Sequence, residues 1–156
     1  MSIDQSFFRR VMGQFASGVT VVTTAVGDEL QGMTVSSFAS LSMEPMLVLI
    51  CIACDTASHE SIQRSGMFAV NMLTEEQEHL SQRFASRDVD KFLSGSYTFA
   101  SSGLPLLNDA LATIECRVVN ALPGGDHTIF VGEILNASVG HGRPLVYYGS
   151  GYYRLG

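Results

Sequence analysis

The spacing of apolar residues predicts a helix near the start of the chain. Over residues 4–15, apolar side chains recur at intervals of three and four, which places them on one helical face. These residues are Phe7, Phe8, Val11, Met12 and Phe15. Ser2 or Asp4 can cap the helix, and the Ala-Ser-Gly segment 16–18 ends it.

Most of the chain after residue 18 follows a strand pattern instead. Runs of β-branched and apolar residues predict strands over 19–25, 30–38, 46–53, 67–73, 111–122, 128–139, 144–148 and 151–155. Turn-forming residues at 27–29 and 123–126 join two pairs of these strands. The polar segment 87–104, rich in Ser and Gly, is expected to be a loop or flap.

Two further short helices are expected among the strands. One spans 58–65 and ends at Gly66. The other begins with a capping box, in which Thr74 precedes Gln77 by three positions, and runs through residue 84. The strands follow one another in pairs rather than alternating with helices. This order favours a mainly β fold, an antiparallel barrel with accessory helices, over a doubly wound parallel sheet.

Composition narrows the classes of function. No repeat or linker divides residues 1–156, so a single domain is expected. Charged residues make up only 15% of the chain, against roughly 25% in typical soluble domains. The missing charges indicate surface turned away from water, at a subunit interface or in a ligand pocket. The net charge of −6 and the lack of a basic run argue against nucleic-acid binding.

No membrane segment or disulfide framework is expected. The longest apolar run, 46–54, is far shorter than a membrane-spanning helix. Residues 1–8 lack an apolar signal region, so a cytoplasmic protein is expected. The three cysteines are an odd number. Cys51 and Cys54 have redox-motif spacing, but they lie in a strand-like run, so buried packing cysteines are favoured over a redox or metal pair.

Common catalytic motifs are missing from the sequence. It has no G-x-G-x-x-G, no phosphate loop of the NTPase type, no H-E-x-x-H and no G-x-S-x-G. The histidines show no metal-ligand spacing, so no metal site is expected. They are His59, His79, His127 and His141.

Three polar clusters remain as candidate sites. Five hydroxyl residues fall within 34–42, where small side chains let a planar ligand approach the backbone; a Ser-rich turn is an equally good interpretation. Segment 55–61 offers hydroxyls at a helix start, which suits a phosphate, although Thr56 or Ser58 as a simple cap is favoured. His127 follows a Gly-rich turn beside an acid, where a solvated side chain is the commoner outcome. The C-terminal tyrosines fit a ring-binding pocket or, more commonly, a sheet edge or an interface.

In this order, these features resemble the short-chain flavin reductase family, the reductase components of two-component flavin-dependent monooxygenases. The similar segments are 8–23, 32–38, 45–51, 65–66, 70–71, 80–81, 83–85, 90–92, 125–127, 132–133, 144–147 and 151–152. Each piece is short, but their combination and order cover nearly the whole chain.

The resemblance implies a split β-barrel of Greek-key type that forms a homodimer and binds FMN or FAD. The residues that it assigns to the flavin are Met33, Thr34, Val35, Ser36, Ser37, Cys51, Ile52, Ala53, Thr56, Ala57, Ser58, Arg83, Phe84, Ala85 and Tyr152. Residues 34–37 then line the isoalloxazine and ribityl chain, residues 51–53 give backbone contacts, and Ser58 meets the phosphate. Residues 83–85 close over the phosphate side. His127 contacts the nicotinamide of NADH, or of NADPH as the alternative.

The implied activity is transfer of a hydride from NADH to flavin, which supplies reduced flavin to a separate oxygenase. Such a transfer needs little from protein acids or bases, because the cofactors carry the chemistry. Asp55 stands near the expected phosphate site, where the family often has a lysine, so phosphate binding is expected to rely on backbone N–H groups and Arg83. Alternatives are a flavin carrier or redox sensor without NADH turnover, an oxidase resembling pyridoxamine-phosphate oxidase, and a purely structural barrel.

Overall fold

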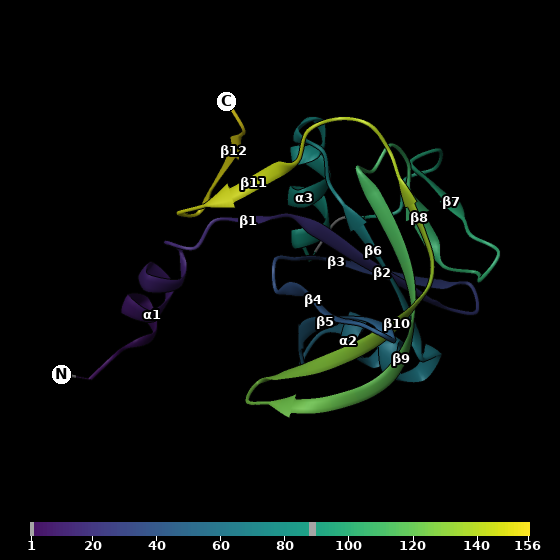
Figure 1. The fold of residues 1–156 in the computed structure, drawn as a ribbon, viewed down its shortest axis with the longest axis horizontal. Coiled ribbons are helices and arrows are strands. Elements are labelled where there is room, and N and C mark those ends of the chain that lie inside the picture. The colour runs from purple at the N-terminus through teal and green to yellow at the C-terminus, as the bar shows by residue number, and fades with distance from the viewer. Residues whose placement is uncertain (1, 88–89) are drawn as a thin grey trace.

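The computed structural model describes residues 2–87 and 90–156, and its main feature is one antiparallel sheet of seven strands (Figure 1). Their order across the sheet is β3 (Glu29–Val35), β2 (Thr20–Val26), β6 (Met67–Met72), β9 (Ala112–Gly124), β10 (His127–Val139), β5 (Met46–Ala53) and β4 (Phe38–Met43). The two outer strands, β3 and β4, follow each other directly in the chain. The sheet therefore curves back on itself as a split barrel, and the predicted mainly β fold is confirmed.

The helices are short and lie outside the sheet. They are α1 (Gln5–Met12), α2 (Ala57–Ser65), the 3₁₀ turn η1 (Glu75–Gln77) and α3 (Glu78–Ala85). Asp4 caps α1 as expected, since its carboxylate accepts a hydrogen bond from Phe7 N at 2.8 Å. In Figure 1, α1 stands apart from the barrel, and none of its residues is buried. Within residues 2–87 and 90–156, no helix is long and apolar enough to cross a membrane.

Two small sheets complete the structure. One joins β1 (Ser17–Gly18), β11 (Leu145–Tyr148) and β12 (Gly151–Arg154), and the other pairs β7 (Tyr97–Phe99) with β8 (Pro105–Leu107). Strand β7 corrects the expectation of a loop over 87–104, of which residues 88–89 lie outside the described chain. Three residues are too few for a visible strand period, and their pairing partner lies beyond the segment.

The expected strand over 30–38 is also corrected, because it is two strands. The chain leaves β3 after Val35 and begins β4 at Phe38, with Ser36 and Ser37 exposed between them. Ser37 bonds twice to Cys51 on β5: its hydroxyl donates to the Cys51 carbonyl at 2.9 Å, and Cys51 N donates to the Ser37 carbonyl at 3.1 Å. The predicted hydroxyl cluster therefore forms the corner between the two edges of the barrel.

Alternate residues of β2 point into two separate cores. Val22 belongs to the barrel interior, together with large buried side chains such as Ile50, Phe68 and Phe130. Val21 points the other way, into a cluster with Phe84 of α3 and Leu145 of β11. Because side chains alternate across a strand, β2 holds the barrel and its outer helix layer together.

The expectation that Cys51 and Cys54 are buried packing residues is wrong for Cys54, which is exposed because β5 ends at Ala53. Cys51 is partly buried, Cys116 is buried, and all three are free thiols. Burial, with the neighbouring carboxylate of Glu115, raises the pKa of the Cys116 thiol to about 12.

We therefore expect a thiol reagent at pH 8 to modify Cys54 in the native protein and to reach Cys116 only after unfolding, because the reactive thiolate is absent from Cys116 at that pH. The number of modified thiols per chain, measured from the chromophore that the reagent releases, is compared before and after adding guanidinium. Replacing Cys116 by Ser should leave the native count unchanged and lower the unfolded count by one. Rapid native labelling of Cys116 would contradict the prediction.

Candidate functional site

A cavity of about 620 Å³ lies where β3, the start of α2 and the end of α3 meet. This volume is within the range of small-molecule sites, roughly 300–1,000 Å³. Its walls come from three parts of the chain that are distant in sequence, namely 30–34, 55–58, and 84–87 together with 90–92. The lining residues are Leu30, Gln31, Gly32, Met33, Thr34, Asp55, Thr56, Ala57, Ser58, Phe84, Ala85, Ser86, Arg87, Asp90, Lys91 and Phe92. Seven predicted flavin residues are among them: Met33, Thr34, Thr56, Ala57, Ser58, Phe84 and Ala85.

The β3 wall is fixed to α3 by a hydrogen bond. Thr34 Oγ1 donates to the Ser81 carbonyl at 2.5 Å, and the Ser81 hydroxyl in turn bonds the Tyr152 hydroxyl at 2.7 Å. Tyr152, which the resemblance assigned to the flavin, therefore supports this wall from behind and does not line the cavity. Arg83, on α3 and partly exposed, does not line it either.

The second wall is the first turn of α2. Thr56 caps the helix: its hydroxyl accepts from His59 N at 3.2 Å and donates to the Ala53 carbonyl at 2.8 Å. The capping interpretation of Thr56 is thus confirmed. Ala57 and Ser58 follow in the first turn, where helices leave backbone N–H groups without a helical partner. Such N–H groups and the helix dipole favour an anion, so this wall suits a phosphate.

The base of the cavity requires a glycine. A Cβ added to Gly32 would lie 2.8 Å from Phe84 Cε1 and 3.1 Å from Phe92 Cζ. The two rings meet edge to face, with centroids 5.2 Å apart. Gly32 therefore lets aromatic side chains from α3 and from segment 90–92 pack directly on the backbone of β3.

Lys91 also lines this cavity, although the local sequence pattern does not single it out. Its ammonium group donates to the Gly32 carbonyl at 3.0 Å, and partial burial lowers the pKa of Lys91 below its usual value. An ammonium group carries three N–H donors, and among residues 2–87 and 90–156 the Gly32 carbonyl takes one of them. The signal was present, since residues 90–92 are one of the segments similar to the family, but nothing in the local pattern placed them beside β3.

The charges around the cavity are mixed. Lys91 and Arg87 contribute positive charge, while Asp55 and Asp90 are exposed acids. The expectation that Arg83 is the basic residue of the site is not supported by its position, because Lys91 and Arg87 line the cavity instead. Both acids are solvated, so they weaken anion binding less than buried acids would.

The other predicted flavin residues form a neighbouring surface. Ser36, Ser37, Cys51 and Ala53 are at least partly exposed beside the barrel corner. Val35 and Ile52 are buried in the barrel interior, so these two can offer only backbone groups to a ligand. This surface extends from the cavity toward the end of β5.

His127 begins β10 directly opposite Ala53 of β5. Its Nδ1 lies 2.8 Å from Asp126 Oδ1, and its side chain is 43% exposed. The carboxylate can only accept, so Nδ1–H is the donor, and Nε2 of the neutral ring is left as an acceptor. The hydrogen bond to His127 lowers the pKa of Asp126, which keeps the carboxylate charged.

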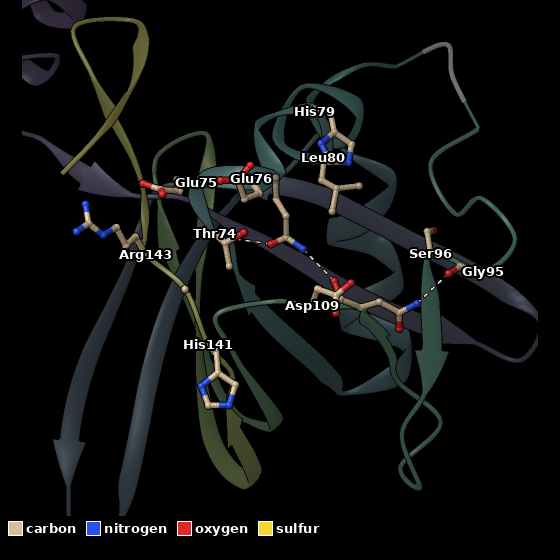
Figure 2. Close-up of a pocket in the computed structure, with 13 residues that line it drawn as sticks. Thr74, Glu75, Glu76, His79, Leu80, Gly95, Ser96, Asp109, His141 and Arg143 are labelled. Atoms are coloured by element: carbon tan, nitrogen blue, oxygen red, sulfur yellow. Dashed lines mark hydrogen bonds between the residues drawn. The ribbon is translucent and has the colours of Figure 1, made fainter. Parts of the chain in front are cut away.

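A second cavity, of about 630 Å³, lies around the start of α3 (Figure 2). Gln77 braces it, accepting from Thr74 N at 3.0 Å and donating to the Asn108 carbonyl at 2.9 Å. His79 and His141 lie on opposite sides of it in Figure 2. Among the described residues no cluster of His, Cys, Asp or Glu has metal-binding geometry. None of the predicted site residues lines this cavity.

Comparison with known proteins identifies relatives along nearly the whole chain. The flavin reductase like domain model matches residues 12–156. The chain is 42% identical over 152 residues to the reductase subunit of a flavin-dependent monooxygenase from Rhodococcus jostii, covering 97% of this chain and 78% of that protein. It is 40% identical to an NADH-dependent FMN reductase from Streptomyces nodosus subsp. asukaensis, covering 95% of this chain and 83% of the relative.

A solved structure agrees in fold and in sequence. The NADH:FAD oxidoreductase of Streptomyces globisporus, determined in complex with NAD and FAD fragments, superposes with a TM-score of 0.94 at 39% identity. The match covers 98% of this chain and 93% of that one. The predicted family, fold class and enzyme class are therefore confirmed, and this chain belongs to the flavin reductase family.

Proposed function

We propose that this chain oxidises NADH and passes the hydride to FMN or FAD, supplying reduced flavin to a separate oxygenase. The observation that carries the proposal is the cavity, which brings three predicted segments together with Lys91 on one side of the barrel. NADH and both flavins appear in the names of its relatives, and the Rhodococcus relative is itself a monooxygenase subunit. Residues 1–156 act as one domain in this proposal, because β2 joins both cores.

The phosphate end of the flavin is assigned to the α2 wall. Ser58, the first-turn amides of α2 and the Lys91 ammonium group converge on the cavity, and together they replace water around an anion. Thr34 and Met33 then border the ribityl chain. The ring system lies toward Ser37 and Cys51, where the exposed backbone N–H groups of residues 36–37 can donate to its carbonyl edge.

The nicotinamide is assigned to His127. The side chain is 43% exposed, and its Nε2 as an acceptor matches the N–H₂ group of a nicotinamide carboxamide. Bound flavin supplies the electron-accepting chemistry. The protein's contribution is to hold the two ring systems at reacting distance and to keep His127 in one tautomer through Asp126.

A direct assay tests the function. Purified protein is mixed with NADH or NADPH and with FMN or FAD, and the nicotinamide absorbance is followed. We expect steady oxidation only when free flavin is present. Protein that turns yellow but does not consume NADH would support the carrier or sensor alternative. Protein that neither binds nor reduces FMN or FAD would refute the proposal.

Lys91 provides a test of the site itself. We expect Lys91→Met to weaken FMN binding about 10- to 100-fold, because a charge-assisted hydrogen bond contributes roughly 1.5–3 kcal/mol. Fluorescence titration of flavin measures the dissociation constant. Arg143→Met, at the second cavity, is the matched control and should leave it unchanged. Equal flavin affinity in the two variants would contradict the assignment.

We propose that the chain works as a homodimer, with α1 at the interface. Helix α1 exposes Phe7, Phe8, Val11 and Met12, and Phe15 beyond it is 78% exposed. An apolar stripe of this kind marks an interaction surface, and a second copy also accounts for the low charge of the chain. Light scattering should give twice the mass of 16.8 kDa, and Phe8→Glu should give the monomer. A monomeric wild type would refute the proposal.

We also place the protein in the cytoplasm. Its three cysteines are free thiols, as is usual where thiols are kept reduced. Cell fractionation followed by immunoblotting tests this location, and recovery of the protein in an oxidising compartment would refute it.

A further inference from the structure

His59 forms a buried polar contact between α2 and β10. Its relative exposure is 8%, and its Nε2 lies 2.7 Å from Thr128 Oγ1. The imidazole also packs against Phe130, with ring centroids 5.3 Å apart. An apolar side chain would satisfy the packing on Phe130, so the hydrogen bond is what distinguishes histidine at this position.

The two ends of this contact belong to different parts of the proposed site. His59 directly follows Ser58, which lines the cavity, and its backbone N–H bonds the Thr56 cap. Thr128 directly follows His127 at the start of β10. The contact therefore links the proposed phosphate-binding turn to the proposed nicotinamide-binding residue.

The strand geometry of β10 explains how a contact at Thr128 can orient the side chain of His127. Successive side chains of a strand point to opposite faces, so Thr128 points toward Phe130 and His59 while His127 points to the outer face. Thr128 pairs with Ile52 and His127 with Ala53. Holding the Thr128 side chain therefore fixes the direction in which His127 projects. The other polar contact of Thr128 is with Cys54 Sγ at 3.6 Å, which is weak and exposed.

We propose that His59 is a positioning residue for hydride transfer: through Thr128 it sets His127 relative to the start of α2. This inference rests on the proposed function. Because small errors in the placement of reacting groups cost large factors in rate, loss of the contact should lower turnover. The phosphate groups are held by α2 and Lys91, so flavin affinity should be retained.

Substitution of both partners tests the proposal. We expect His59→Leu and Thr128→Val each to lower kcat about tenfold, with the dissociation constant for FMN changed less than about twofold. The double variant should lose no more than either single one, because both remove the same contact. His59→Gln and Thr128→Ser keep a hydrogen-bonding group and should recover most of the activity. His79→Leu replaces an exposed histidine of α3 and serves as control.

The outcomes separate positioning from simple stabilisation. Wild-type kcat in His59→Leu and Thr128→Val overturns the proposal, even if their melting temperatures fall. A loss of FMN affinity that matches the loss in kcat also overturns it, because it would place His59 in flavin binding. If His59→Leu does not fold, Thr128→Val, which exchanges one hydroxyl for a methyl, decides the question. If the wild-type protein does not oxidise NADH, both the proposed function and this inference are overturned. The wild-type assay gives that result before any variant is made.

Discussion

Replacing His127 by alanine is expected to lower kcat/KM for NADH by about 10²-fold while flavin affinity stays nearly intact. The side chain lies opposite Ala53 on the outer face of the barrel, outside the cavity assigned to the flavin phosphate. It therefore has no role in holding that end of the flavin. Steady-state kinetics with varied NADH, together with fluorescence titration of FMN, measure the two effects separately.

Asp126→Asn is the matched control for His127→Ala. It keeps an acceptor for Nδ1 of His127 but removes the charge, so a much smaller loss is expected. The hydrogen bond to His127 lowers the pKa of Asp126, so its carboxylate is charged above the ordinary Asp pKa and loses that charge only as pH falls through the lowered value. Loss of the Asp126 charge should therefore not limit activity at mildly acidic pH. Collapse of flavin binding with unchanged NADH kinetics in His127→Ala would refute the role.

Replacing Phe68 by alanine should produce the largest loss of stability, about 3–5 kcal/mol. Phe68 is completely buried on β6, in the barrel core. Its ring packs on the backbone of β10, since a Cβ added to Gly132 would lie 2.6 Å from Phe68 Cζ. A neighbour that is backbone cannot collapse into the cavity left behind. At about 2–4 °C per kcal/mol, the melting temperature measured by circular dichroism should fall by roughly 6–20 °C.

Phe99→Ala removes the same ring from a position that is 60% exposed. Its expected effect is within about 0.5 kcal/mol. Equal destabilisation by the two substitutions would contradict the assignment of Phe68 to the core. Both proteins should be measured without flavin, because a bound ligand adds its own stabilisation.

The local sequence pattern was sufficient to predict most of the helices and strands. The capping residues Asp4, Thr56 and Thr74, and the terminator Gly66, lie where expected, because caps depend on neighbours a few residues away. The strand β7 was missed and the strand over 30–38 was not divided, because both features depend on pairing with distant strands.

In the candidate site too, short motifs predicted some residues, whereas others depend on contacts between residues far apart in the sequence. Thr34, Ser58 and Phe84 were singled out from family resemblance, and they do line one cavity. The resemblance assigns Arg83 to the site, whereas Lys91 lines the cavity and Arg83 does not, because a helix end and the following segment can turn either residue toward β3. Only the packing of Phe84 and Phe92 on Gly32 decides that Lys91 enters the site.

Local patterns along the chain were enough to predict most strands and helices in their order, with β7 and the break at 36–37 as exceptions, and also the family of the chain. Each of these depends on short-range periodicity or on the succession of motifs along the chain. The tertiary structure decided which residues face one another: Lys91 with Gly32, Thr34 with Ser81, and His59 with Thr128. Such pairs are far apart in sequence, and they meet only because the sheet curves and brings α2 and α3 against its strands.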